Sequence, residues 1–81
     1  MLMTVKLFAR ARDLAGAEMV SVEVPDPASV ADLRDCLASA YPALKSLLGR
    51  SALAVNNEFA DDATILPHQA ELALLPPVSG G

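Results

Sequence analysis

Hydrophobic and polar positions alternate at the start of the chain. Along residues 2–9, Met3, Val5 and Leu7 share one parity and are all apolar, whereas the other parity mixes apolar and polar residues. Because successive side chains of a strand point to opposite faces, this pattern predicts a β-strand with the first set facing the core. The same argument places Phe8 on the wetter face.

Further apolar runs, separated by turn-forming residues, predict the other elements. The expected strands are residues 17–24, 51–56 and 71–75, with a brief pairing at Phe59 and Ala60, and the expected helical segments are 10–15, 30–41 and 43–48. Neither parity of the second strand is uniformly apolar, so its faces stay unassigned. The last strand is apolar on both faces near its end, which is typical of a central strand or of one that carries a binding face.

The longest helix has the clearest boundaries. Ser29 is a good N-cap, Asp32 stands where a capping box places its second acceptor, and Pro42 prevents simple continuation beyond Tyr41. Apolar residues recur at helical spacing and form one stripe. The stripe is Val30, Leu33, Leu37, Ala40 and Tyr41.

The order of elements predicts an α+β fold, with a small mixed sheet packed on one main helix. This order fits a ubiquitin-like β-grasp without singling it out. The chain has 81 residues and a mass of 8.4 kDa, which leaves no room for a second core. We expect residues 1–75 to form the domain and residues 76–81 to form a flexible tail.

Composition and charge exclude several classes of function. Six Lys and Arg stand against ten Asp and Glu, a net charge of −4, which argues against nucleic acid and anionic membranes as partners. The single cysteine excludes an internal disulfide and a cysteine-based zinc cage, and with one histidine a metal site is not expected. Neither a secretory signal nor a membrane-spanning run is recognisable, so a cytoplasmic protein is expected.

The end of the sequence carries the most informative chemistry. Pro76 and Pro77 end the strand and stiffen the exit, whereas Gly80 and Gly81 accept nearly any backbone angle. Such an arm could carry its terminal carboxylate into a narrow site on another protein. Adenylation by ATP would turn this poor electrophile into an acyl adenylate, and attack by a sulfide equivalent would then give a thiocarboxylate. The alternative is an ordinary frayed terminus without function.

The chain lacks the residues for a complete active site of its own. The single histidine, His68, stands in a polar loop and offers no credible context for a Ser-His-Asp set, and no glycine-rich phosphate loop is present. The chain would therefore supply the reacting group, and a partner would supply the acid–base residues and the substrate pocket. It would be part of an enzyme only as one subunit of a heteromeric assembly.

Two segments resemble the small, sulfur-carrier subunits of molybdopterin synthase, the MoaD-like family. Residues 8–16, FARARDLAG, match that family's F-A-x-x-R-[DE]-L-x-G segment, and residues 72–81, LALLPPVSGG, resemble its C-terminal end. Ala54-Val55-Asn56 matches the end of its third strand, and the likeness covers the whole chain. One departure is His68-Gln69-Ala70, where the family usually has Asp-Gly-Asp before the glutamate that this chain keeps.

The resemblance implies a ubiquitin-like β-grasp fold and a specific chemistry. Gly81 would be adenylated by an activating enzyme that consumes ATP and then converted to a thiocarboxylate, with Gly80 beside it in the tail. The sulfur would pass to a cyclic pyranopterin phosphate to build the dithiolene of molybdopterin. The implied partners are a large synthase subunit in a heterotetramer, the activating enzyme and a sulfur-donor protein, and no bound cofactor is implied.

The resemblance also implies which residues contact the partners. The family has apolar residues at the positions of Phe8, Phe59 and Leu75 against both partners, whereas the residues alone would favour core packing. Arg12 matches the arginine of F-A-x-x-R and would pair with an acidic group on a partner, the alternative being a solvated surface arginine.

The remaining tail residues and the reactive side chains complete these expectations. Pro76, Pro77 and Val78 would contact the large subunit as the tail enters it. Cys36 is expected to be a small buried hydrophobic residue rather than a sulfur relay, and His68 a loop residue without a catalytic role.

Two other functions remain open from the sequence. One is a sulfur carrier for a different pathway, such as thiazole, thio-modified tRNA or amino-acid synthesis, since those carriers share the Gly-Gly end. The other is a ubiquitin-like modifier, which would form isopeptide bonds to lysines, or a plain binding module, which would tolerate loss of Gly80 and Gly81. A molybdenum destination cannot be separated from a tungsten one, because both metals use the same pterin.

Overall fold

The computed structural model describes residues 1–77, so the tip of the expected tail, Val78 to Gly81, lies outside the described residues. Every predicted element is present, with boundaries that differ by one or two residues. The elements are β1 (Leu2–Leu7), α1 (Ala9–Ala15), β2 (Met19–Glu23), α2 (Val30–Ala40), the 3₁₀-helix η1 (Pro42–Leu44), α3 (Lys45–Leu48), β3 (Ala52–Val55), β4 (Glu58–Ala60) and β5 (Leu72–Leu75).

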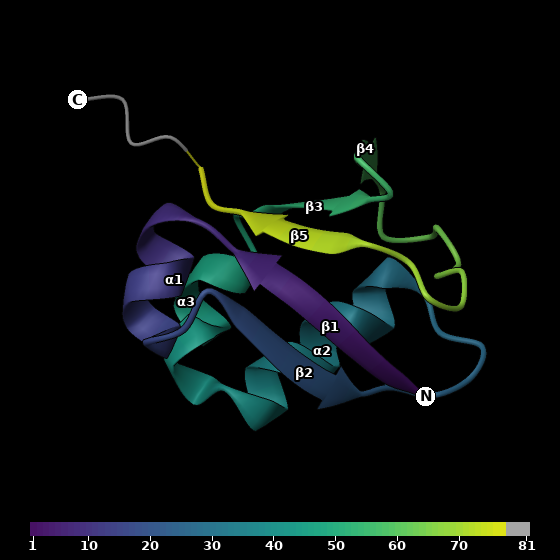
Figure 1. Ribbon diagram of the computed structural model, residues 1–81, viewed down its shortest axis with the longest axis horizontal. Helices are drawn as coiled ribbons and strands as arrows, with labels where there is room; N and C mark the ends of the chain where they lie inside the picture. The colour runs from purple at the N-terminus through teal and green to yellow at the C-terminus, as the bar shows by residue number, and fades with distance from the viewer. Residues whose placement is uncertain (78–81) are drawn as a thin grey trace.

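The five strands form one mixed sheet in the order β2-β1-β5-β3-β4 (Figure 1). The pair β1 and β5 is parallel, and every other neighbouring pair is antiparallel. The last strand is therefore central, as its two apolar faces allow. Since β5 runs parallel to β1, the two strands finish at the same end of the sheet, which is where α1 begins.

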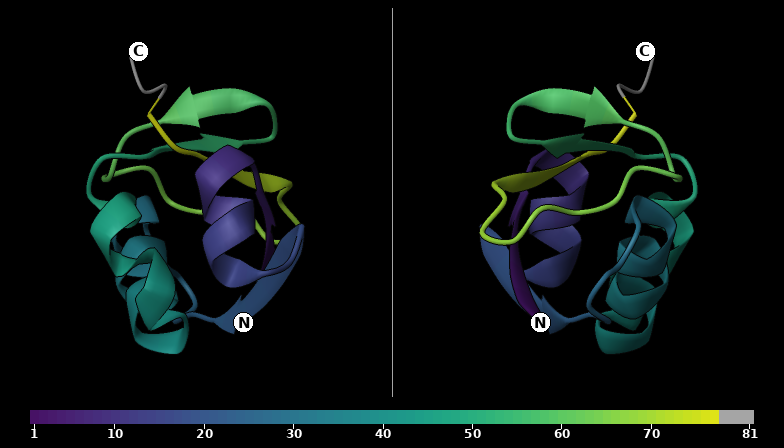
Figure 2. Two further views of the ribbon diagram at one scale, coloured as in Figure 1. Left: turned by 90° about the vertical axis from the view of Figure 1, so that its left-hand side faces the viewer. Right: turned by 90° about the vertical axis from the view of Figure 1, so that its right-hand side faces the viewer.

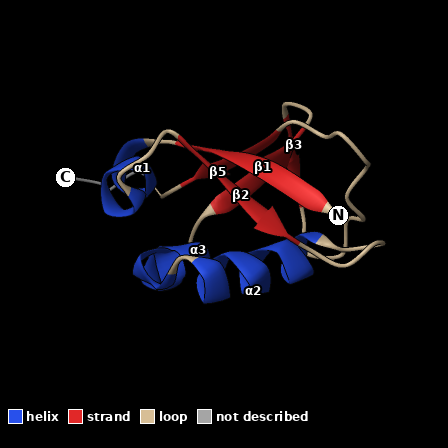
Figure 3. Ribbon diagram, turned by 60° about the horizontal axis from the view of Figure 1, so that its bottom comes forward, coloured by secondary structure: helices blue, strands red, loops and turns tan. Residues whose placement is uncertain are grey.

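The helices α2 and α3 cover one face of the sheet, and α1 lies at its end (Figures 2 and 3). The alternation predicted for β1 is confirmed, because Met3, Val5 and Leu7 are all buried. In β2 the inward residues are Val20 and Val22, which settles the faces that the sequence left unassigned. The arrangement confirms the predicted α+β, ubiquitin-like β-grasp fold.

The core is aliphatic and lies between the sheet and α2. Its largest fully buried side chains are Leu33, Leu37, Leu44, Leu53, Leu72, Leu74, Val5 and Val30. Burying one such side chain contributes about 1.5–3 kcal/mol to folding. Among residues 1–77, no helix or strand covers the opposite face of the sheet (Figure 3).

The helix α2 begins as predicted and ends differently. Its capping box is complete, because the Ser29 hydroxyl accepts from the Asp32 backbone N–H at 3.2 Å and the Asp32 carboxylate accepts from the Ser29 N–H at 2.9 Å. At the other end, Ala40 is exposed and is not part of the buried stripe. The half-buried Tyr41 caps the helix, and its hydroxyl donates to the Ser21 carbonyl of β2 at 2.8 Å. The buried stripe therefore ends at Leu37, and Tyr41 leaves it because its backbone, with φ of −130° and ψ of 78°, is no longer helical.

Left-handed backbone occurs in the turn from β3 to β4 and in the loop before β5. Asn56 and Asn57, with φ of 51° and 69°, join β3 to β4, a geometry that asparagine tolerates better than most residues. Gln69, with φ of 60°, precedes β5 at the position where the MoaD-like pattern has glycine. The loop therefore keeps the glycine-type backbone although the glycine itself is missing.

Within residues 1–77, no helix is long and apolar enough to cross a membrane. The same part of the chain contains no group of three or more His, Cys, Asp or Glu residues that could hold a metal ion.

Candidate functional site

The three predicted apolar docking residues lie together on the uncovered face of the sheet. Phe8, Phe59 and Leu75 line one shallow cleft, whose other lining residues are Ala54, Asn57 and Ala73. Phe8 is 43% exposed and Phe59 is 77% exposed, so neither aromatic ring is part of the core. We call this cleft the apolar cleft.

The register of the sheet explains why these residues meet. Ala54 lies opposite Phe59 on one side and opposite Ala73 on the other. Leu75 shares the face of Ala73, two residues further along β5, and is half-buried. The small alanines form the floor of the cleft, and the larger side chains form its walls. Exposed aromatic residues around such a floor are typical of an interaction surface.

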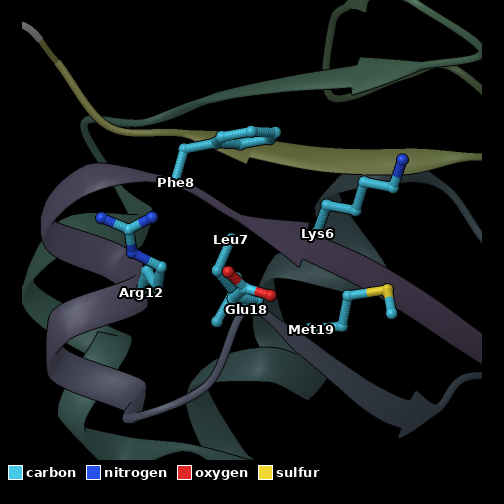
Figure 4. A pocket seen from close by; sticks show the side chains of 6 residues that line it. All are labelled: Lys6, Leu7, Phe8, Arg12, Glu18 and Met19. Carbon is cyan, nitrogen blue, oxygen red and sulfur yellow. The ribbon is translucent and has the colours of Figure 1, made fainter.

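The backbone after β1 directs Phe8 onto this face. Phe8 is extended, with φ of −126° and ψ of 155°, and Ala9 then adopts a left-handed φ of 51°. This sharp turn starts α1 directly after the strand. It leaves the Phe8 ring over β5, where Figure 4 shows it, and puts the first turn of α1 beside the end of β1. A left-handed conformation at a residue other than glycine often marks a functional position.

Arg12 lies in a second cleft, on the other side of Phe8. This cleft is lined by Lys6, Leu7, Phe8, Arg12, Glu18 and Met19 (Figure 4). Phe8 therefore forms a wall of both clefts, whereas Arg12 and Phe59 do not line the same one. We call the second cleft the charged cleft.

The base of the tail follows the apolar cleft directly. Pro76 is half-buried and Pro77 is exposed, and they come immediately after Leu75. The remaining predicted tail residues, Val78, Gly80 and Gly81, lie outside the described residues. The described part of the tail thus leaves the domain beside the predicted docking residues, at the end of the sheet where α1 lies.

Cys36 and His68 lie elsewhere. Cys36 is half-buried and lines a groove between α2 and β2 together with Val22 and Ser39. Because β2 is separated from β5 by β1, this groove is remote from the tail. His68 forms an exposed hydrogen bond with Asp26 at 2.9 Å, which ties two loops together.

Seven of the residues that line the two clefts were not predicted as site residues, namely Lys6, Leu7, Glu18, Met19, Ala54, Asn57 and Ala73. Ala54 and Ala73 were not expected to form a floor, and Lys6 and Met19 were not expected to face one another. The outward parity of β1 marked Lys6 as exposed, but its pairing with Met19 depends on the register between β1 and β2. No signal in a single sequence gives that register.

Comparison with known proteins identifies the family. The family model described as the ThiS family matches residues 5–81. The molybdopterin synthase sulfur carrier subunit of Arabidopsis thaliana is 38% identical over 77 residues, covering 95% of this chain and 80% of the relative. Small archaeal modifier protein 1 of Haloferax volcanii is 39% identical over 84 residues, covering 94% of this chain and 97% of the relative.

Solved structures agree with this assignment. The crystal structure of the Haloferax volcanii modifier SAMP1 superposes with a TM-score of 0.86 at 38% identity and covers 100% of both chains. A chain from the complex of subunits 1 and 2 of the molybdopterin-converting factor of Helicobacter pylori superposes with a TM-score of 0.69 at 28% identity, again covering 100% of both chains. The chain therefore belongs to the ThiS family of sulfur carriers, with the ubiquitin-like β-grasp fold.

Proposed function

We propose that this chain is the sulfur-carrier subunit of a molybdopterin synthase. The observation that carries the proposal is the position of the apolar cleft, with its exposed Phe8 and Phe59, at the root of the tail. A partner that binds this cleft is held where the chain beyond Pro77 begins. The likeness to the Arabidopsis thaliana and Helicobacter pylori proteins supports the choice of pathway.

The chemistry starts at the carboxylate of Gly81. One of its oxygens attacks the α-phosphorus of ATP, which forms the acyl adenylate and releases pyrophosphate. A sulfide equivalent from the sulfur-donor protein then attacks the carbonyl carbon, and AMP leaves with the carboxylate oxygen. The product is a C-terminal thiocarboxylate. Gly80 and Gly81 carry no Cβ, so neither step is crowded by a side chain.

The sulfur then passes to a cyclic pyranopterin phosphate held by the partner. In each transfer the thiocarboxylate sulfur bonds to a side-chain carbon of the pyranopterin and displaces the oxygen substituent there. Water then hydrolyses the resulting thioester, which breaks the bond between the carbonyl carbon and sulfur and restores the Gly81 carboxylate. A dithiolene contains two sulfur atoms, so each molybdopterin requires two such transfers. The chain itself holds no cofactor in this scheme, and ATP is consumed by the activating enzyme.

The partners follow from this scheme. The large synthase subunit supplies the pocket and the acid–base residues, and two copies of each subunit form a heterotetramer. The Helicobacter pylori structure is a complex of subunits 1 and 2, which supports a large-subunit partner. The activating enzyme uses the same apolar cleft in an earlier step, and both reactions take place in the cytoplasm.

Within the complex, the side chains of the apolar cleft have a docking role. Phe8, Phe59 and Leu75 bury their exposed surface against the partner, and Pro76, Pro77 and Val78 contact the large subunit where the tail enters it. Aromatic residues are the usual energetic anchors of such interfaces.

An intact-mass measurement tests this function. The chain is produced together with its activating enzyme and a sulfur source, and the expected product is heavier by the difference between one sulfur and one oxygen atom. Deleting Gly81 should abolish this species without affecting folding. The thiocarboxylate form should then yield a dithiolene product with the large subunit and the pyranopterin. An unchanged mass with an activating enzyme that works on another carrier would contradict the proposal.

A protein modifier is the second candidate, because the chain is 38% identical in sequence to the Haloferax volcanii modifier with a TM-score of 0.86. The two functions diverge after adenylation. A modifier would join Gly81 to a lysine amine of another protein, and the same mass experiment on a cell extract would show covalent adducts. A thiocarboxylate that reacts with the pyranopterin and forms no adducts would favour the synthase.

A further inference from the structure

The charged cleft brings two basic side chains to the uncovered face of an acidic protein. Lys6 of β1 and Arg12 of α1 both line it and are both exposed. Within residues 1–77, the ion pairs involve Met1, Arg34 and His68 as the cationic partners, so neither Lys6 nor Arg12 is neutralised by a described carboxylate within 4.0 Å. The whole chain has a net charge of −4, so a cleft with two such cations differs in charge from the rest of the molecule.

The rest of the cleft is apolar, with one acidic side chain. Leu7 and Phe8 contribute apolar walls, and Met19 lies beside Lys6 because the two residues are directly opposite in the register of β1 and β2. Met19 is 55% exposed, which leaves its flexible, polarizable side chain free to adapt to a partner. Glu18 lines the cleft below Leu7 in Figure 4.

The size of the cleft indicates what it can hold. Its volume is about 240 Å³, below the roughly 300–1,000 Å³ of sites that bind small molecules. One or two protein side chains fill such a volume. The cleft shares Phe8 with the apolar cleft, so the two form one continuous surface.

We propose that the charged cleft extends the docking surface and receives an acidic segment of the large-subunit partner. This inference rests on the function proposed above. The segment places an apolar side chain between Met19 and Phe8 and an adjacent carboxylate against Lys6, while Arg12 on the other side of the cleft adds to its positive charge. Glu18 disfavours a carboxylate on its own side of the cleft and so sets the orientation of the segment. Charge complementarity of this kind governs orientation and association rate more than total affinity.

The two lysines of the chain provide a matched test. Lys6 lies in the charged cleft, whereas Lys45 lies in the helical layer, where it lines a surface depression with Asp35. Both are exposed, and Lys6→Glu and Lys45→Glu change the net charge equally. We expect Lys6→Glu to weaken binding of the unmodified full-length chain to the large subunit about tenfold at low salt, with little change for Lys45→Glu. Raising the salt to about 0.5 M should reduce the difference, because screening acts on exposed charges.

A variant that binds the large subunit more tightly provides a second test, because damage to the fold would weaken binding and not strengthen it. Glu18→Gln removes the like charge from the cleft and should tighten binding about twofold, whereas Asp35→Asn on the helical layer should not. Titration calorimetry with purified large subunit measures all four variants and the wild type.

The outcomes separate the two proposals. If wild-type chain binds and the two lysine variants bind equally, the charged cleft has no role and this inference fails while the proposed function stands. If Lys6→Glu binds more tightly than wild type, the segment is basic and the inference fails as well. If wild-type chain does not bind the large subunit at all, the proposed partner is wrong and the inference fails with it.

Discussion

At the scale of single residues, Gln69 has a backbone conformation that glycine adopts far more readily. Its φ is 60°, and its side chain is exposed and has no hydrogen bond within the described residues. Holding a residue other than glycine in the left-handed region lowers the free energy of unfolding by about 1–3 kcal/mol. Replacing it by glycine removes this strain, but part of the gain is lost because glycine makes the unfolded chain more flexible. We therefore expect Gln69→Gly to raise the free energy of unfolding by about 1 kcal/mol. Urea denaturation measures the change.

The matched control at this position is Gln69→Ala. It removes the side chain but keeps the Cβ that causes the strain, so the free energy of unfolding should stay within about 0.5 kcal/mol of wild type. If both variants stabilise the protein equally, the side chain and not the backbone is the source of the cost. Sulfur transfer should be unaffected by either variant, because Gln69 lines neither cleft.

At the scale of elements, Tyr41 protects the exposed edge of the sheet. The strand β2 is an edge strand, and the Tyr41 hydroxyl donates to the Ser21 carbonyl at 2.8 Å. Because β1 bonds to the alternate residues of β2, starting with the Glu18 carbonyl, the Ser21 carbonyl faces outward. A free edge carbonyl invites pairing with another chain. The Tyr41 side chain thus links the end of α2 to β2 and occupies a backbone carbonyl at the edge of the sheet.

We expect Tyr41→Phe to lower the free energy of unfolding by about 0.5–1.5 kcal/mol, the usual net value of one hydrogen bond. Urea denaturation of Tyr41→Phe and Tyr41→Ala separates the hydroxyl from the ring, and the alanine variant should lose more stability. Sedimentation at increasing protein concentration then reports whether the freed edge associates. A Tyr41→Phe variant as stable as wild type would mean that water replaces the hydroxyl without cost.

The elements were largely predictable from local patterns, because their causes are local. Ser29 and Asp32 three residues apart predict a helix start, and the alternation of Met3, Val5 and Leu7 predicts a strand and its buried face. The end of α2 was predicted less well, because Tyr41 leaves the helical stripe for a contact with Ser21, 20 residues earlier in the chain. Such long-range contacts are not contained in a local period.

The candidate site was predictable in part for the same reason. The family resemblance implied Phe8, Phe59 and Leu75, and the fold brings these three into one cleft. Their alanine floor and the pairing of Lys6 with Met19 depend on strand order and register, which bring distant residues together. A single sequence does not specify that register, so the charged cleft was not predictable.

At the scale of the whole molecule, apolar side chains serve two separate purposes. One set, which includes Leu53, fills the core between the sheet and α2, whereas a second set stays exposed on the uncovered face. Small domains bury a limited fraction of their surface, so exposed apolar residues are expected on them. Exposure alone therefore does not identify a docking residue, and the position of the exposed side chain relative to the clefts does. Phe59, 77% exposed, lines the apolar cleft, whereas Leu2, 62% exposed, lies on the same face at the far end of β1 and lines neither of the two clefts.

This separation predicts that folding and docking respond to different substitutions. Leu53→Ala opens a cavity in the core and should lower the free energy of unfolding by about 2–5 kcal/mol. Phe59→Glu should leave stability within about 0.5 kcal/mol of wild type, since the ring contributes little to the core, yet weaken binding to the large subunit at least tenfold. Leu2→Glu changes the net charge equally on a residue that is also more than half exposed and should leave binding unchanged. Urea denaturation and titration calorimetry on the three variants measure both effects. Equal binding by Phe59→Glu and Leu2→Glu would place the docking surface elsewhere, and unfolding of Phe59→Glu would assign its ring to the core.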